Sequence, residues 1–596
     1  MKTRSLFLIS LVAALPAWSQ TITTVAGNSS WSDIQNVAVD NQGNIYAPDA
    51  QKHVVYKVDR LGGTTVIAGT GVAGYSGDGA LANAAQLRIP DGVAIGSDGS
   101  VYISDYGNNR IRKIAPNGII TTFAGTGVAG FLGDGGQATA ARIYNPSQIV
   151  MDQAGNLLFV DISNFRIRKI TPAGVISTVA GTGRCPVLSG DNGPANSADS
   201  CPGWLAVGPD GSVYFTDDGD LRYFGYSRIR KVAPNGVITT VAGGGTVGFS
   251  GDGGPATAAL FRGISGVAVD SGGNIFISDS ANSRIRKVDT SGTVNTYAGT
   301  GTNGASGDGG PAIKAQVSQP CGMVFDSENN LLFADRLNVK IRKISPPPIP
   351  AIRTGNAVLT SFLGNAGFSS NTYVEIYGAN FATTSRLWSG TDFNGANAPT
   401  SLDGVSVTVN GKPAFVYYIS PSQININTPE DTAVGPVAVQ VRTPLGLSNS
   451  VSVTRSRISP TLQSVSQFLI GGRQYVVALT PDFSRYIGRP GMIQGVNFGP
   501  ARPGDTVSIY ALGCGPTSPP TQAGVIAAQG ASLSLPYQIK IGGVPATVTF
   551  AGAVGASIGL YQFNVVIPQV DSGDQPIELT IDGISNSQNL YTVIGQ

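Results

Sequence analysis

Tyr102-Ile-Ser-Asp105-Tyr-Gly-Asn-Asn-Arg110-Ile-Arg-Lys113 is the segment that reveals how this chain is built, because its pattern recurs along the sequence. The aspartate that ends its apolar run recurs at steps of 56, 56, 56, 62 and 56 residues, at Asp49, Asp105, Asp161, Asp217, Asp279 and Asp335. The basic tetrad keeps the same period at residues 110–113, 166–169, 228–231, 284–287 and 340–343. Self-similarity at a fixed period of this length indicates a repeat architecture.

Each repeat reads as four short strands. In the second repeat they are predicted at residues 92–95, 101–104, 110–114 and 119–124. Asp98-Gly99 and Asn117-Gly118 are hairpin turn signals, because glycine accepts a positive φ. Four antiparallel strands per unit, repeated radially, predict an all-β fold with a β-propeller, here of six blades.

The two ends of the repeat region complement each other. The sixth repeat stops after its third strand, near Ile344, and residues 21–27 resemble the fourth strand of the other repeats. We therefore predict that the N-terminal segment supplies the outer strand of the last blade. Such closure removes the open sheet edges that invite aggregation.

The C-terminal part is a different kind of chain. Ser345-Pro-Pro-Pro-Ile-Pro350 reads as a stiff linker, and the repeat disappears after it. Residues 409–414 parallel residues 541–546, and alternating runs such as 437–441 read as half-buried strands. Short strands with regular turns predict two Ig-like β-sandwiches. The predicted organisation is a signal peptide at 1–19, a propeller at 20–345, a linker at 346–350, and sandwiches at 351–456 and 457–596.

The N-terminus has the pattern of an export signal. Lys2 and Arg4 precede an apolar run at residues 6–15, and small residues at Ala17 and Ser19 suit cleavage after Ser19. No later segment is apolar enough to cross a bilayer. The protein is therefore expected to be secreted, periplasmic or at the cell surface. Cys185 and Cys201, 16 residues apart, are expected to form a disulfide, and Cys321 and Cys514 to be free and buried.

Composition argues against several functions. The net charge of +2 over 596 residues gives no bulk electrostatic case for nucleic-acid binding. His53 is the single histidine, so a zinc site with several histidines is excluded and a catalytic triad would have to use it. Gly69-x-Gly71-x-x-Gly74 matches a dinucleotide fingerprint as text, but the following Tyr-Ser-Gly-Asp-Gly cannot begin the helix that this site requires. No cofactor is expected.

The candidate binding face carries the connections after the second and fourth strands of each repeat. The connections after the fourth strands are long, and long loops are usually functional or specially folded. The same face holds the mouth of the central channel. The candidate binding residues are Gln35, Asp91, Ser147, Trp204, Ser265, Arg110, Arg166 and Arg284.

Two repeated features have alternative interpretations. The aspartates of the Gly-Asp-Gly turns are weak calcium candidates, or they accept hydrogen bonds from nearby backbone N–H groups; they are Asp78, Asp134, Asp252 and Asp308. The basic tetrads form a ring that attracts an anionic polymer, or they are structural. The structural interpretation pairs carboxylate with guanidinium across the tight loop, at Asp105/Arg110, Asp161/Arg166 and Asp279/Arg284.

The repeats resemble NHL repeats over residues 21–345, through Val-Ala-Val-Asp40, Gly-Asn-Ile-Tyr46 and Asn109-Arg-Ile-Arg-Lys113. The resemblance implies a propeller used mainly as a recognition platform, although some related six-bladed propellers are enzymes. The C-terminal pair is similar to the IPT/TIG-related Ig-like modules of secreted acidobacterial proteins, which implies an extracellular role. The expected function is non-catalytic recognition of a glycan or protein through the loop-rich face. The alternatives are a lyase or hydrolase acting at the channel mouth, and a structural or adhesion component of the cell surface.

Overall fold

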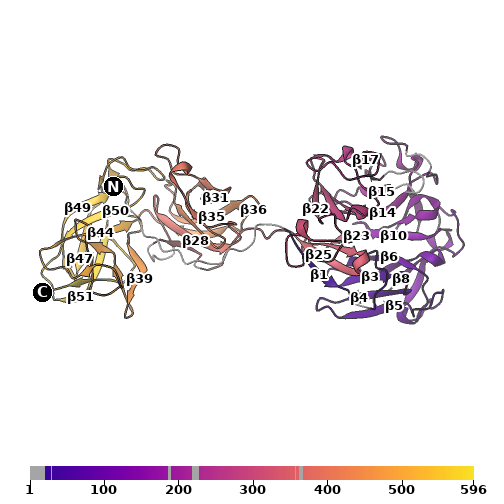
Figure 1. Ribbon diagram of the computed structural model, residues 1–596, viewed down its shortest axis with the longest axis horizontal. Coiled ribbons are helices and arrows are strands. Elements are labelled where there is room, and N and C mark those ends of the chain that lie inside the picture. The colour runs from indigo at the N-terminus through magenta and orange to yellow at the C-terminus, as the bar shows by residue number, and fades with distance from the viewer. Residues whose placement is uncertain (1–19, 28–29, 186–188, 218–226, 356, 362–366) are drawn as a thin grey trace. The chain divides into compact units, whose positions relative to one another are not determined.

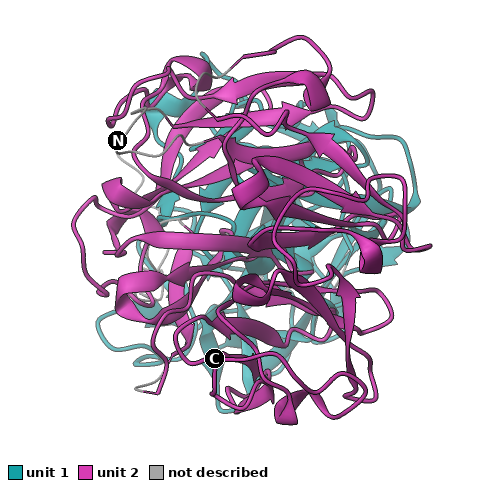
Figure 2. Ribbon diagram, turned by 90° about the vertical axis from the view of Figure 1, so that its right-hand side faces the viewer, with its two compact units in different colours: residues 1–18, 348–596 teal, residues 19–347 magenta. Residues whose placement is uncertain are grey.

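The computed structural model describes residues 20–27, 30–185, 189–217, 227–355, 357–361 and 367–596. The chain divides after Pro347 into two compact units, coloured separately in Figure 2. The predicted signal peptide at residues 1–19 lies outside the described residues. The predicted all-β fold class, a propeller followed by Ig-like sandwich architecture, is confirmed.

The propeller unit, magenta in Figure 2, contains six antiparallel sheets among its described residues, and in four of them the strands follow chain order. The first five are β2 (Ala38–Val39), β3 (Ile45–Asp49), β4 (Val54–Val58), β5 (Thr64–Ala68); β6 (Pro90–Ile95), β7 (Val101–Asp105), β8 (Arg110–Ile114), β9 (Ile120–Ala124); β10 (Pro146–Met151), β11 (Leu157–Asp161), β12 (Arg166–Ile170), β13 (Ile176–Ala180); β14 (Pro202–Val207), β15 (Val213–Asp217), β16 (Arg228–Val232), β17 (Ile238–Ala242); and β19 (Ile264–Val269), β20 (Ile275–Asp279), β21 (Arg284–Val288), β22 (Thr293–Ala298), with β18 (Gly254–Pro255) added at its edge.

The remaining sheet joins the two ends of the unit. It consists of β23 (Pro320–Phe325), β24 (Leu331–Asp335), β25 (Lys340–Ser345) and β1 (Thr21–Ala26). β1 pairs antiparallel with β25, with Ile22 opposite Ile344, and the two strands lie together in Figure 1. The prediction that the N-terminal segment supplies the outer strand of the last sheet is confirmed.

The core of this unit is divided among the interfaces between neighbouring sheets. One cluster joins Val55 and Ala68 of the first sheet to Val93, Ile103 and Ile120 of the second. Each sheet packs against two neighbours, so the second strand of each repeat is buried along its whole length and reads as a continuous apolar run. The repeat therefore fixes both the sheets and the surfaces that hold them together.

The C-terminal unit, teal in Figure 2, contains two sandwiches with separate apolar cores. The main strands of the first are β28 (Tyr373–Ala379), β33 (Phe415–Ile419) and β34 (Gln423–Asn427) in one sheet, and β31 (Val405–Val409), β35 (Gly435–Thr443) and β37 (Val451–Arg455) in the other. Those of the second are β44 (Thr506–Leu512), β49 (Thr547–Ala553) and β50 (Tyr561–Val566), facing β47 (Tyr537–Ile541), β51 (Gly573–Ile581) and β53 (Leu590–Ile594). Backbone N–H groups of Ala523 and Gly524 donate to Glu430 and Asn427, so the two sandwiches contact each other within the unit.

Candidate functional site

The connections after the second and fourth strands share one face of the propeller, called here the loop-rich face. A short 3₁₀ turn, η2 (Tyr106–Asn108), follows β7, and its Asn108 Nδ2 donates to Gly74 O at 2.7 Å in the long loop after β5. Equivalent bonds recur from Asn164 to Gly130, from Asn282 to Gly248 and from Asn338 to Gly304. These bonds tie each tight turn to the preceding long loop, so the two kinds of connection form one surface.

A buried arginine lies at each of five junctions between sheets, called here the seams. Arg112 on β8 is fully buried, and its Nη2 lies 2.7 Å from Asp78 Oδ1 and its Nη1 3.4 Å from Asp105 Oδ2. Each arginine thus bridges the long loop of one repeat and the second strand of the next. The same arrangement holds for Arg168 with Asp134 and Asp161, Arg230 with Asp191 and Asp217, Arg286 with Asp252 and Asp279, and Arg342 with Asp308 and Asp335.

The seams correct the predicted pairing of Asp105 with Arg110, and of its counterparts Asp161/Arg166 and Asp279/Arg284. The carboxylate instead pairs with the arginine two residues further along the strand. Arg112 lies one residue pair deeper in the sheet, and its long side chain reaches the buried carboxylate. Arg110 turns outward and donates to the backbone carbonyls of Asn108 at 3.2 Å and Thr126 at 2.8 Å.

The seams also correct the predicted role of the Gly-Asp-Gly aspartates, which do not bond mainly to neighbouring backbone N–H groups. Asp78 accepts bonds from Tyr75 Oη at 2.9 Å, Thr122 Oγ1 at 2.7 Å and Arg112. Burial raises the pKa of Asp78, but these hydrogen bonds and the guanidinium outweigh it and hold the pKa below its usual value. The calcium candidates Asp78, Asp134, Asp252 and Asp308 therefore each already face an arginine. Among the residues that the structure describes, no group of three or more His, Cys, Asp or Glu could hold a metal ion.

The first arginines of three tetrads do lie on the loop-rich face, each against an aromatic ring. The guanidinium carbon lies 3.8 Å from the Tyr75 ring centroid for Arg110, 3.8 Å from Phe131 for Arg166, and 4.1 Å from Phe249 for Arg284. The rings remain 42%, 42% and 44% exposed. We call these pairs the rim stacks. The aromatic members were not predicted from the sequence, although each stands three residues before the loop aspartate.

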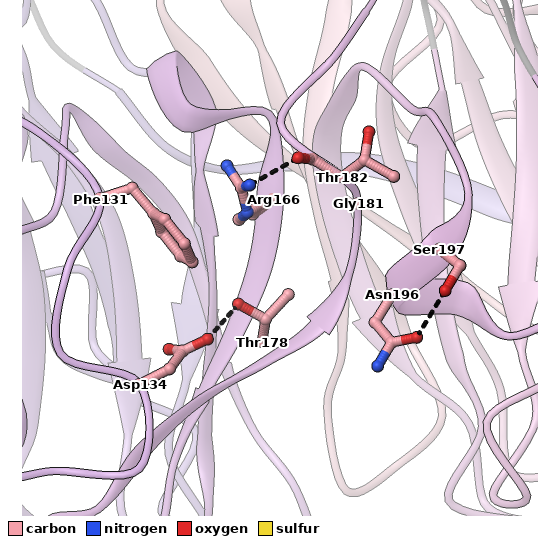
Figure 3. Close-up of a pocket in the computed structure, with 8 residues that line it drawn as sticks. All are labelled: Phe131, Asp134, Arg166, Thr178, Gly181, Thr182, Asn196 and Ser197. Carbon is pink, nitrogen blue, oxygen red and sulfur yellow. Dashed lines mark hydrogen bonds between the residues drawn. The ribbon is translucent and has the colours of Figure 1, made fainter.

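A pocket of about 460 Å³ opens beside the second rim stack. Figure 3 shows Phe131, Arg166 and Asp134 on one side and Asn196 and Ser197, from a short 3₁₀ turn, on the other. The two terminal nitrogens of Arg166 donate to Asn164 O at 2.9 Å and Thr182 O at 2.5 Å. The stack is thus held in place by backbone carbonyls, and an aromatic ring lies beside hydroxyl and amide groups.

The inner strands of the six sheets converge at the centre. The candidate binding residues Gln35, Asp91, Ser147 and Ser265 occupy equivalent positions at or just before the start of these strands. Cys321 occupies the same position in the last sheet, and Gly203, followed by Trp204, occupies it in the fourth. At the following position, Asn36 Nδ2 of the first sheet donates to Gln148 Oε1 of the third at 3.1 Å. Trp204 packs against apolar clusters from both sides of the centre. Side chains from different sheets therefore meet at the propeller axis.

Asp91 differs from the other buried carboxylates of the propeller. It is partly buried, and within the described ranges its carboxylate has no hydrogen bond or ion pair. Burial and the nearby Asp33 carboxylate raise the pKa of Asp91 to about 6, and Arg336 opposes this only in part. Asp33 itself accepts bonds from Arg336 Nε at 3.0 Å and Gln35 Nε2 at 2.9 Å. Asp33 and Arg336 were not predicted from the sequence, because neither residue type recurs at its position in the other repeats.

The remaining sequence predictions concern single residues. His53 Nδ1 accepts a hydrogen bond from the backbone N–H of Ile89 at 3.1 Å, which gives this histidine a structural partner. The predicted disulfide between Cys185 and Cys201 is confirmed. Cys321 and Cys514 are free and buried, as predicted, and burial raises the pKa of the Cys321 thiol to about 12. No helix in the described ranges is long and apolar enough to cross a membrane.

Comparison with protein families identifies segments in both units. Residues 19–130 match the teneurin NHL domain, residues 261–288 match the NHL repeat, and residues 357–455 match the IPT/TIG domain. The first two matches lie within the propeller unit, and the third covers most of the first sandwich.

Several curated proteins are similar to part of this chain. Teneurin-1 of Gallus gallus is 29% identical over 279 residues, and teneurin-4 of Homo sapiens is 30% identical over 279 residues. Each alignment covers 41% of this chain and 10% of the relative, so the chain spans about a tenth of the length of these teneurins. The chloroplastic protein Suppressor of Quenching 1 of Arabidopsis thaliana is 27% identical over 291 residues, which is 47% of this chain and 27% of that protein.

Solved structures are similar with a lower sequence identity. Virginiamycin B lyase from Staphylococcus aureus matches with a TM-score of 0.35 and 15% identity, over 55% of this chain and 99% of the lyase. An auxiliary nutrient binding protein from Bacteroides thetaiotaomicron matches with a TM-score of 0.40 and 15% identity, over 55% of this chain and 77% of that one. These scores are too low to carry a functional argument. The sequence matches and the observed sheets together show that the chain combines NHL repeats, folded as a β-propeller, with an IPT/TIG-type Ig-like domain.

Proposed function

We propose that this protein is a non-catalytic recognition protein that acts outside the cell and binds a glycan or a protein through the loop-rich face of its propeller. The observation that carries the proposal is the set of rim stacks, in which an exposed aromatic ring lies on an arginine in three of the repeats. Aromatic and arginine side chains dominate the energetics of binding surfaces.

The arginines of the rim stacks are not needed to neutralise the buried aspartates of the seams. Arg112, Arg168 and Arg286 already pair with the buried carboxylates, so Arg110, Arg166 and Arg284 are left to hold the exposed rings. Backbone carbonyls fix each guanidinium, which lowers the entropy that a ligand must remove on binding. Loops on a rigid scaffold are the usual location of binding residues.

The pocket beside Phe131 supports the same function. Its volume of about 460 Å³ lies in the ordinary range for sites that bind small molecules or single ligand groups. Its lining combines an aromatic ring with the polar side chains of Asn196 and Ser197. His53, the only histidine that a hydrolytic triad could use, has its Nδ1 occupied by the Ile89 N–H, which favours recognition over catalysis.

The test is a binding screen of the full chain against a polysaccharide panel and a panel of extracellular proteins. The triple variant Tyr75→Ala/Phe131→Ala/Phe249→Ala is expected to weaken binding to any retained ligand by at least about tenfold. The matched control is Leu61→Ala, which removes a 96% exposed apolar side chain from a connection on the opposite face. Equal binding by the triple variant and the parent protein, or loss of binding in the control alone, would overturn the proposal.

A further inference from the structure

The Asp91 carboxylate is an uncompensated charge at the centre of the propeller. Its neighbour Asp33 is already held by Arg336 and Gln35, at 3.0 and 2.9 Å. The charged groups around this point are therefore two carboxylates and one guanidinium, a net charge of −1 that resides on Asp91. Tyr106 also faces it, since burial, the Asp91 carboxylate and then Tyr144 raise the pKa of Tyr106.

Two unpartnered polar atoms lie on the neighbouring sheet. Ser147 Oγ and Gln148 Nε2 belong to side chains that are each 5% exposed, and neither has a hydrogen-bond partner among the residues described. Leaving buried polar atoms unsatisfied destabilises a protein, so their presence here needs an explanation. Ser147 occupies in the third sheet the position that Asp91 occupies in the second.

The two sheets are in close contact at this point. A Cβ placed on Gly92, the residue after Asp91, would lie 2.4 Å from Ser147 O, so the backbones here touch. Ser104 Oγ donates to the same Ser147 carbonyl at 2.5 Å. Gln148 extends toward the axis, where its Oε1 meets Asn36. We call the cluster of Asp91, Ser147 and Gln148 the hub site.

We propose that the hub site binds a protonated amine that carries a hydroxyl on the adjacent carbon, as an amino sugar does. An ammonium group donates hydrogen bonds, and the Asp91 carboxylate and Ser147 Oγ can accept them. Gln148 Nε2 is a donor and requires an oxygen on the ligand, which the vicinal hydroxyl supplies. A lysine side chain has the ammonium group but no oxygen next to it, so it would leave Gln148 Nε2 unpaired.

The neighbouring aromatic rings suit the same ligand. Tyr106 lies near Asp91, and Tyr144 is 40% exposed. A sugar ring has an apolar face of C–H groups that packs on an aromatic ring, while the tyrosine hydroxyl stays available for hydrogen bonding. A single divalent cation fits less well, because Asp33 is already paired with Arg336 and only one carboxylate remains free.

The probe is glucosamine, titrated into the full chain and followed by ligand-observed NMR, with N-acetylglucosamine as the uncharged analogue. Glucosamine is expected to bind at least about tenfold more tightly than N-acetylglucosamine at pH 7.0. Affinity is expected to fall about tenfold between pH 7.0 and pH 5.0, because a carboxyl with a pKa of about 6 is mostly ionised at the first pH and mostly protonated at the second. Asp33, Arg336 and Tyr106 are the other charged or titratable groups that face it.

Variants separate this site from the rim. Asp91→Asn is expected to abolish both the preference for glucosamine and its pH dependence, and Asp210→Asn, in an exposed turn on the opposite face, to change neither. The readout here is glucosamine binding and its loss in Asp91→Asn, which involve none of the rim stacks, so failure of the rim proposal would not affect this one. The inference is wrong if glucosamine does not bind, if N-acetylglucosamine binds equally well, or if n-butylamine, an ammonium without a neighbouring oxygen, binds as tightly. It is equally wrong if Asp91→Asn binds glucosamine like the parent protein.

Discussion

The seams and the hub site both place aspartates inside the propeller, and they treat the charge in opposite ways. At the seams the fully buried Asp105 faces Arg112, and this pairing recurs at five junctions. At the hub Asp91 occurs once and has no partner in the described part of the chain. A charge that is paired at five junctions holds the sheets together, whereas a charge that occurs once and is left unpaired is available to a ligand.

Breaking a seam should produce the largest effect. Arg286→Met leaves Asp252 and the buried Asp279 without their guanidinium, and removing one partner of a buried ion pair typically costs about 3–5 kcal/mol. The propeller transition in a urea titration of the full chain should shift by that amount. Arg284→Met, two residues earlier on the same strand, is the matched control and should cost less than about 1 kcal/mol. If both variants lose the same stability, the seam is not what distinguishes the two arginines.

One of the seams also carries a disulfide, between Cys185 and Cys201. The disulfide closes the loop before β14, and the backbone N–H of Cys201 donates to the seam carboxylate of Asp217 at 2.7 Å. A loop of this length is worth about 3 kcal/mol in the chain-entropy treatment. The double variant Cys185→Ala/Cys201→Ala should therefore lower the thermal midpoint of the propeller, measured by calorimetry. Treatment of the parent protein with a reductant should reproduce the shift, and the double variant should not respond to the reductant.

At the hub the same residue type should have the opposite effect on stability. The pKa of Asp91 is about 6 in the folded protein, above its usual 3.8, so the folded state binds the proton more tightly than the unfolded state does. The contribution of Asp91 to the free energy of unfolding is therefore largest when the carboxyl is protonated in both states, and it falls as the pH rises from about 4 through 6. Asp91→Asn removes this penalty and should stabilise the propeller by about 1–3 kcal/mol at pH 7. Urea titrations at pH 4 and pH 7 measure it, and the gain should be absent at pH 4.

Asp98→Asn serves as the control for the hub variant. The backbone hydrogen bond from Ser100 does most to lower the pKa of this exposed carboxyl; burial opposes it in part, and the Ser100 hydroxyl and Lys113 lower the pKa further. Its substitution should give no stabilisation at pH 7. An equal gain in both variants would mean that the effect comes from net charge and not from the position of Asp91.

The sequence predicts the features that recur in each repeat, and it does not predict contacts made by residues that occur only once. The 56-residue period places the strands of the second sheet within two residues and predicts the closure by β1, because both depend on local apolar patterns. It gives the wrong arginine for Asp105, because Arg110 and Arg112 occupy the same face of the strand. Only the direction of the side chain distinguishes them: Arg112 turns toward Asp105, and Arg110 turns outward to Thr126 O. Asp33 and Arg336 stand 303 residues apart, and neither residue type recurs at its position in the other repeats, so no local pattern could join them.

Substitutions in the rim stacks should change the free energy of unfolding least, in contrast to substitutions in the seams. Phe131 is 42% exposed and borders a pocket, so Phe131→Ala leaves no closed cavity and should change the stability of the propeller by less than about 0.5 kcal/mol. The same substitution removes one platform of the proposed binding surface and should weaken binding to any ligand found in the screen. Urea titration and binding measured on the same preparation test the two together. A large loss of stability would place the rim stacks with the seams, as structural braces, and would leave the loop-rich face without the observation that supports its role in recognition.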